Sequence, residues 1–163
     1  MRRPQVAIIG AGEGATNDDI AVARDLGRRV ASGGWIVLTG GRDAGVMDAA
    51  SRGAKEIAGS LTIGILPNAA TSTSAAVDVR IITDMGESRN NIIVRSSDMV
   101  IACGLHDAGT ASEVALAIKA GKPVVVIGAG AAAMDVFGSI DPTICFATSA
   151  EEALETLRDR FSG

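Results

Sequence analysis

The sequence contains no tyrosine, and aromatic residues make up only 2% of its 163 residues. Proteins that bind single-stranded nucleic acid stack the bases on aromatic side chains, so this composition argues against that class. Acidic residues also outnumber basic ones, 19 to 15, whereas proteins that bind nucleic acid backbones carry an excess of basic residues. We therefore expect no nucleic acid partner. A small anionic ligand remains compatible with this balance, because helix ends and single arginines act locally.

Histidine and cysteine, the usual ligands of zinc, are scarce as well. The only histidine is His106, and the two cysteines, Cys103 and Cys145, do not form a C-x-x-C motif. A structural zinc site needs about four nitrogen or sulfur ligands, so no metal site is predicted. The longest uncharged apolar run, Val124–Met134, is shorter than the about 18 residues that cross a membrane, and the apolar stretch near the N-terminus is too short for a signal peptide. We expect a cytoplasmic protein without a membrane partner.

Apolar residues make up 47% of the chain, and 20 residues are glycine. Short β-branched runs alternate with longer runs of helical period, which is typical of an α/β fold, and most of the short runs are continuously apolar, as in parallel sheets buried on both faces. The expected strands are Gln5–Ile9, Trp35–Thr39, Leu61–Leu66, Val79–Thr83, Met99–Cys103, Pro123–Ile127 and Thr143–Phe146. The expected helices are Thr16–Ser32, Ala44–Ala58, Glu87–Ser97, Ala111–Ala120 and Ser149–Phe161.

This alternation predicts a single-domain, Rossmann-like, doubly wound sheet of about seven mostly parallel strands, extending over residues 1–163. The polar segment Pro67–Val77 is predicted to be an exposed loop. In such a sheet a ligand lies beyond the carboxyl ends of the strands, near the point where the strand order reverses. The residues that directly follow the strands are therefore the candidates for a site.

Glycines follow the first expected strand, at Gly10, Gly12 and Gly14. Glycine lets a ligand approach the backbone, and the start of the next helix offers free N–H groups to an anion. The segment also fits a loose G-x-G-x-x-A dinucleotide motif, but the acidic residue that this motif needs after the second strand is absent. NAD binding is therefore disfavoured, and a tight turn without a function is the alternative.

A second set of candidates follows the second expected strand: Gly40, Gly41, Arg42, Gly45 and Met47. Backbone N–H groups and a guanidinium together suit a phosphate. The segment is not a Walker loop, because the chain contains no G-x-x-x-x-G-K-[ST]. The alternative is a plain turn in which Arg42 pairs with Asp43.

Arg89 and Asn90 follow the fourth expected strand, at the start of a helix. An arginine in the first turn opposes the helix dipole at a cost of about 0.3–1 kcal/mol. A residue placed against local preference is a candidate for function. The alternative is that Arg89 bonds Glu87 or Asp84 on a solvated surface.

The segment after the fifth expected strand includes Gly104, Gly109, Thr110 and Glu113. Thr110 and Glu113 have the spacing of a capping box, which alone would explain both residues. Because the other glycine loops lie at neighbouring strand ends, Glu113 could instead place its carboxylate in the ligand site. His106 and Asp107 could suggest a general base, but no G-x-S-x-G motif accompanies them, so a hydrolase triad is not predicted.

Three segments, in this order, resemble motifs of the LOG family, which is often mislabelled lysine decarboxylase. Residues 40–47 resemble its GGGxxGxM motif, residues 109–113 resemble the end of its PGGxGTxxE motif, and residues 85–90 lie where the family has MHxRK. The family's cytokinin-activating members cleave the N-glycosidic bond of nucleoside 5′-monophosphates with an arginine and a glutamate. The resemblance implies that Arg89 and Glu113 are the catalytic residues if this protein is such a hydrolase.

The chain departs from the hydrolase pattern where residues 103–108 replace the Pro-Gly-Gly start and where Asn90 replaces the lysine after the arginine. Residues 40–42, the Arg89–Asn90 pair and the turn at residues 121–123 are more similar to the molybdenum cofactor carrier proteins, which bind a pterin bearing a phosphate. The resemblance implies a carrier that requires no cofactor of its own, with the molybdenum cofactor as a possible bound ligand.

We expect the protein to bind a small phosphorylated, nucleotide-like ligand, with a molybdenum cofactor carrier as the first expectation. The alternatives are a nucleoside 5′-monophosphate phosphoribohydrolase and a ligand-sensing module, so whether the protein is an enzyme stays open. The Ala-rich, weakly charged helix expected at Ala111–Ala120 indicates burial on both sides, and hence a homo-oligomer. The expected ligand-binding residues are Gly10, Gly12, Gly14, Gly40, Gly41, Arg42, Gly45, Met47, Arg89, Asn90, Gly104, Gly109, Thr110 and Glu113.

Overall fold

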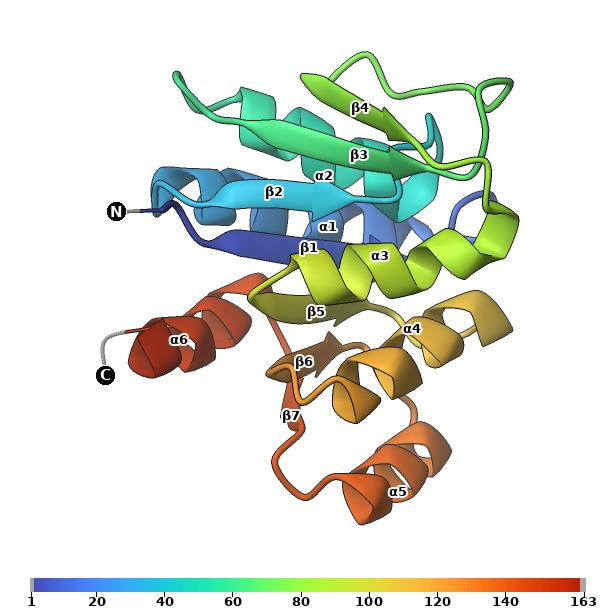
Figure 1. Cartoon of the computed structure of the whole chain (residues 1–163). Coiled ribbons are helices and arrows are strands. Elements are labelled where there is room, and N and C mark those ends of the chain that lie inside the picture. The colour runs from blue at the N-terminus through green and yellow to red at the C-terminus, as the bar shows by residue number, and fades with distance from the viewer. Residues whose placement is uncertain (1, 162–163) are drawn as a thin grey trace.

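Strands and helices alternate along residues 2–161, the part of the chain that this computed structural model describes (Figure 1). The strands are β1 (Gln5–Gly10), β2 (Ile36–Thr39), β3 (Thr62–Leu66), β4 (Val79–Ile82), β5 (Met99–Cys103), β6 (Val124–Ile127) and β7 (Cys145–Ala147). The α-helices are α1 (Asn17–Ser32), α2 (Gly45–Lys55), α3 (Arg89–Ser96), α4 (Ala108–Lys119), α5 (Ala131–Ile140) and α6 (Ala150–Phe161). Residues 1, 162 and 163 lie outside the described residues, so the extent of the domain over residues 1–163 stays a prediction.

The seven strands form one sheet in the order β4-β3-β2-β1-β5-β6-β7, and every pair of neighbours is parallel. The chain builds outward from β1 to β4 and then crosses to the other side of β1, where β5 pairs with it up to Gly10↔Cys103. The strand order therefore reverses between β1 and β5, and a crevice is expected at their carboxyl ends. The predicted single-domain, Rossmann-like, doubly wound fold is confirmed.

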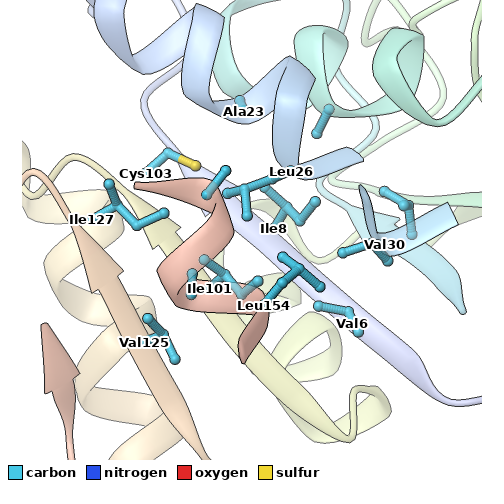
Figure 2. Close-up of a cluster of buried hydrophobic side chains, with 14 of the residues drawn as sticks. Val6, Ile8, Ala23, Leu26, Val30, Ile101, Cys103, Val125, Ile127 and Leu154 are labelled. Atoms are coloured by element: carbon cyan, nitrogen blue, oxygen red, sulfur yellow. The ribbon is translucent and has the colours of Figure 1, made fainter. Parts of the chain in front are cut away.

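Apolar side chains build one core on each face of the sheet. In β1, Val6 and Ile8 face the core beneath α1, α2 and α6, part of which Figure 2 shows. Ala7 and Ile9 face the second core, beneath α3 and α4. Helices thus cover both faces, which a parallel sheet of continuously apolar strands requires.

Helices α1 and α2 pack against each other at Gly27 with very little space. A methyl group added to Gly27 would lie 1.9 Å from the carbonyl oxygen of Ala50 in α2, whereas one added to Gly14 would have nothing within 4 Å. Because the obstructing atom belongs to the backbone, the two helices must move, and overpacking of this kind costs about 1–3 kcal/mol.

We therefore expect Gly27→Ala to lower the free energy of unfolding by about 1–3 kcal/mol, measured by urea unfolding. Gly14→Ala serves as the matched control and should leave the midpoint nearly unchanged, because its methyl group meets no neighbour. Equal stability of the two variants would contradict the close contact between α1 and α2.

The structure differs from the sequence prediction at β4 and α5. A strand is predicted at residues 79–83 and is found as β4, but this edge strand is exposed along its whole length, unlike the buried strands that most of the apolar runs predict. The sequence prediction omits α5, although Met134, Phe137 and Ile140 recur at helical spacing. None of the residues of α5 is fully buried.

The loop between β3 and β4, predicted to be exposed, is partly packed against its neighbours. Ser74 is buried, and its hydroxyl donates to Asp48 Oδ1 in α2 at 2.6 Å. Thr73 forms an isolated antiparallel bridge with Arg42, in the segment after β2. The expectation of an exposed loop holds for residues 68–70, 72 and 75 but not for Pro67 and Ser74, and these contacts hold the loop next to the strand ends.

Candidate functional site

A polar cavity of about 110 Å³ lies at the carboxyl ends of β1 and β2, beside the first turns of α3 and α4. It gathers residues from the segments that follow β1, β2, β4 and β5, which the sequence singles out as candidates. Its lining residues are Ile9, Gly10, Ala11, Gly12, Gly40, Arg42, Met47, Glu87, Arg89, Asn90, Asp107, Gly109, Thr110 and Glu113.

Glycines form one wall of this cavity, at positions where larger side chains would collide with neighbouring residues. A methyl group on Gly10 would lie 2.7 Å from the carbonyl oxygen of Cys103. One on Gly40 would lie 2.7 Å from Met47 Sδ and 3.2 Å from Arg89 Nη2. Gly10 thus allows β1 to lie close to the end of β5, and Gly40 leaves room for the Arg89 guanidinium.

Arg89 begins α3 and is only 5% exposed. Its Nη1 donates to Asn90 Oδ1, rather than to Glu87 or Asp84, so the predicted alternative of a solvated surface pair is wrong. Among the described residues, its Nε has no hydrogen bond partner. Burial lowers the pKa of Arg89, while the nearby Glu113 and Glu87 act to raise it. The site therefore contains a buried cation with a free donor.

Glu113 lies one turn into α4 and is 8% exposed. Burial raises the pKa of its carboxyl to about 8, although Arg89 opposes this shift. The predicted Thr110–Glu113 capping box is wrong, because α4 begins earlier and Asp107 is its N-cap. Asp107 accepts from Thr110 N at 2.9 Å and from Thr110 Oγ1 at 2.8 Å. Capping therefore does not account for Glu113, which is mainly neutral at pH 7.

Arg42 lies at the rim of the cavity. Its Nη2 donates to Glu13 Oε1 at 2.8 Å, in the loop after β1. The predicted alternative, a pair between Arg42 and Asp43, is wrong: Asp43 Oδ1 instead lies 3.9 Å from Arg52 Nη2. The Arg42–Glu13 pair is solvent-exposed, so a ligand anion can compete for Arg42 at little cost.

A sequence model of the SLOG cluster4 family matches residues 3–157. The chain belongs to this family. The molybdenum cofactor binding protein from the phototrophic bacterium Rippkaea orientalis is 45% identical to it, with a TM-score of 0.94 and 99% of each chain covered. The molybdenum cofactor carrier protein from Chlamydomonas reinhardtii is 41% identical, with a TM-score of 0.92 and 99% of each chain covered. An uncharacterized protein from Archaeoglobus fulgidus is 42% identical over 124 residues, 76% of this chain and 80% of that protein.

These similarities confirm the predicted membership of the LOG-like superfamily, close to the molybdenum cofactor carriers. In this SLOG protein, the sequence prediction misses Ile9, Ala11, Glu87 and Asp107 as lining residues of the cavity. Asp107 could have been found, since an aspartate shortly before Gly-Thr is a favourable N-cap. Ile9 and Ala11 give no signal of their own, because they line the cavity only as neighbours of Gly10.

The remaining predicted residues of the SLOG protein lie outside the cavity. Gly14 is exposed, and Gly41 packs against β3, where an added methyl group would lie 2.9 Å from Gly64 Cα. Gly45, with φ of 51°, allows α2 to start against the loop after β1, since a methyl group there would lie 2.1 Å from the carbonyl oxygen of Gly12. Gly104 lines a different cavity.

Cys103 is buried, and burial raises the pKa of its thiol, so it does not act as a nucleophile at neutral pH. Among the described residues, no group of three or more histidine, cysteine, aspartate or glutamate side chains could hold a metal ion. Within residues 2–161, no helix has both the length and the apolar character that a membrane crossing needs.

Proposed function

We propose that this SLOG protein binds the molybdenum cofactor as cargo and holds the phosphate of its pterin in the cavity beside Arg89. The observation that carries the proposal is the nearly buried Arg89 side chain, whose Nε has no hydrogen bond partner among the described residues. A buried donor without an acceptor costs about 1–3 kcal/mol, and more when it is charged. A phosphate oxygen would supply the missing acceptor through a charge-assisted hydrogen bond.

The size of the cavity fits the phosphate end of the cofactor alone. At about 110 Å³ the cavity is too small for a pterin as well. It adjoins two larger hollows, one of about 440 Å³ that shares Arg42 and Glu87 with it, and one of about 580 Å³ that shares Glu87, Asn90 and Gly109. The pterin and the molybdenum would lie in one of these hollows, outside the cavity of Arg89.

The similarity to the binding protein from R. orientalis and the carrier from C. reinhardtii supports the same proposal. Its test is to express the protein in cells supplied with molybdate and to measure pterin fluorescence and molybdenum content of the purified protein. We expect both to elute with the protein in similar molar amounts. A protein that elutes with neither, also after incubation with the isolated cofactor, would contradict the proposal.

Hydrolysis of nucleoside 5′-monophosphates is the second candidate, because Arg89 and Glu113 line the same cavity. Burial raises the pKa of Glu113, so at pH 7 it is not the ionised carboxylate that stabilises an oxocarbenium-like transition state. A neutral carboxyl can protonate a leaving group, so the similarity to the cofactor carriers, and not this pKa, favours the carrier. Incubation with AMP should therefore release no adenine, and release that disappears in Glu113→Ala would establish the hydrolase instead. A partner protein captured only in the presence of the cofactor would point to a ligand-sensing module.

We further propose that the protein is a homo-oligomer. Large apolar side chains are exposed on α5, where Val136 and Ile140 are 55% and 61% exposed, and on β4, where Ile81 and Ile82 are exposed. In Figure 1 these two elements lie at opposite ends of the sheet. Light scattering should give a multiple of the monomer mass of 16.5 kDa, and the monomer mass itself would contradict the proposal. The absence of nucleic acid and membrane partners and the cytoplasmic location stay predictions from the sequence.

A further inference from the structure

A second cavity, of about 510 Å³, lies at the carboxyl ends of β5, β6 and β7. It shares no lining residue with the cavity of Arg89. The loop between β5 and α4 separates the two, since Gly104 lines the second cavity and Asp107 lines the first. The lining residues are Asp18, Asp19, Ala21, Val22, Gly104, Val126, Ile127, Gly128, Ala129, Met134, Phe146, Ala147 and Thr148.

The walls of this second cavity are mostly apolar, with Val22 from α1, Met134 from α5 and Phe146 from β7. Its volume lies within the range of about 300–1,000 Å³ that is usual for small-molecule sites. Two glycines with positive φ, Gly104 at 71° and Gly128 at 75°, lie at the strand ends that form its base. Their missing side chains keep the base of the cavity open.

One polar group lies deep in the second cavity, the carboxylate of Asp19. The side chain is 8% exposed, and a methyl group on Gly104 would lie 2.6 Å from its Oδ1. Its Oδ2 accepts from Thr16 N at 2.9 Å and from Thr16 Oγ1 at 2.8 Å. Its Oδ1 accepts no hydrogen bond from a described residue, and His106 Nε2 lies 3.5 Å away. The long contact with His106, which is an ion pair only when the imidazole is protonated, is thus the one partner of Oδ1 among the described residues, and the oxygen can still accept a hydrogen bond from a ligand.

The charge of the second cavity is of one sign. Asp18 adds a second carboxylate, and no lysine or arginine is among the described residues that line the cavity. A nearly buried carboxylate whose Oδ1 has only the long His106 contact favours a ligand that brings a cationic N–H group. The same charge disfavours a phosphorylated ligand, whereas the cavity of Arg89 contains two arginines, Arg42 and Arg89, beside its carboxyl groups.

We propose that the second cavity is a separate binding site for a small apolar molecule that carries one ammonium or amidinium group. The cation donates to Asp19 Oδ1, and the apolar body of the ligand contacts Ile127, Met134 and Phe146. Gly104 and Gly128 line the second cavity, so the NMR signals of their backbone amides should shift when a ligand binds there. The proposal does not depend on the binding of the molybdenum cofactor, because the two cavities have no lining residue in common.

Benzamidine, which joins an aromatic ring to an amidinium, is a suitable probe, and benzoate is its counterpart of similar shape and opposite charge. In amide NMR spectra of the full-length protein, benzamidine should shift the signals of Gly104, Gly128 and Met134 in a saturable way, and benzoate should not. Asp19→Asn keeps an oxygen for the N-terminus of α1 but removes the charge, and should weaken binding at least tenfold. Asp25→Asn, on the same helix but outside the cavity, should leave the affinity unchanged.

Met134→Lys provides a second variant that does not touch the buried carboxylate. Met134 is 40% exposed, so the substitution is compatible with folding and adds a competing cation at the cavity. It should also weaken benzamidine binding at least tenfold. Signals that shift elsewhere in the protein, equal binding of benzoate, or unchanged affinity in Met134→Lys or in folded Asp19→Asn would overturn the proposal.

Discussion

Arg89→Ala is expected to weaken the binding of a phosphorylated pterin by about 10- to 150-fold. The reason is the loss of a charge-assisted contact, which contributes about 1.5–3 kcal/mol. Arg89 is 5% exposed, so solvent screens its charge poorly, and Gly40 leaves it the space to reach the cavity. The measurement is a calorimetric titration with the phosphorylated pterin at neutral pH and fixed ionic strength.

Arg95→Ala is the matched control for Arg89. Both residues belong to α3, but Arg95 is exposed and does not line the cavity. It should change the dissociation constant little, which separates the loss of the contact from a general change in charge. If Arg89→Ala binds the phosphorylated pterin as tightly as Arg95→Ala does, then Arg89 is not part of the site.

Glu113 is expected to make the binding of the phosphorylated pterin depend on pH. Burial raises the pKa of its carboxyl to about 8, so at pH 7 the group is mainly neutral and can donate to a phosphate oxygen. Above pH 8 the carboxylate forms and repels the anion in the same cavity. Affinity should therefore fall as the pH rises through 8, by up to about tenfold per pH unit. Glu113→Gln keeps a neutral donor and should bind at pH 7 like the original protein, without this fall.

The same group should affect the stability of the unliganded protein. In the unfolded chain Glu113 ionises near its ordinary pKa of 4.5, whereas in the folded chain it stays neutral up to about 8. Ionisation therefore favours the unfolded state first, and the free energy of unfolding falls as the pH rises from about 4.5 to about 8. Glu113→Gln lacks this loss and should be more stable above pH 8 by up to about 5 kcal/mol, with little difference near pH 4. Parallel stability curves for the two proteins would contradict a buried neutral Glu113.

Much of the fold and of the cavity follows from local patterns in the sequence. Continuous apolar strands predict a parallel sheet, and the carboxyl ends of parallel strands meet at one edge. Glycines and charged residues after several strands must therefore lie together there, as Gly10, Gly40, Arg89 and Glu113 do. The unusual position of Arg89 in the first turn of α3 is a further signal that the sequence contains.

The remaining features depend on contacts between distant segments. Which residue pairs with Arg42 depends on how the loops after β1 and β2 meet, and Glu13 competes with the sequence neighbour Asp43. That β4 is exposed follows from its place at the edge of the sheet, which its sequence alone does not show. The pKa of Glu113 depends on the burial of one side of α4. Thr110 and Glu113 have the spacing of a capping box, so their sequence alone favours capping, whereas the N-cap of α4 is Asp107.

The most direct test of the central proposal is a crystal structure of the protein with the phosphorylated pterin bound. We expect the phosphate within hydrogen-bonding distance of Arg89 Nε, beside Gly12 and Gly109, with the pterin in one of the adjoining hollows. A phosphate bound elsewhere, with Arg89 Nε still lacking an acceptor, would contradict the account.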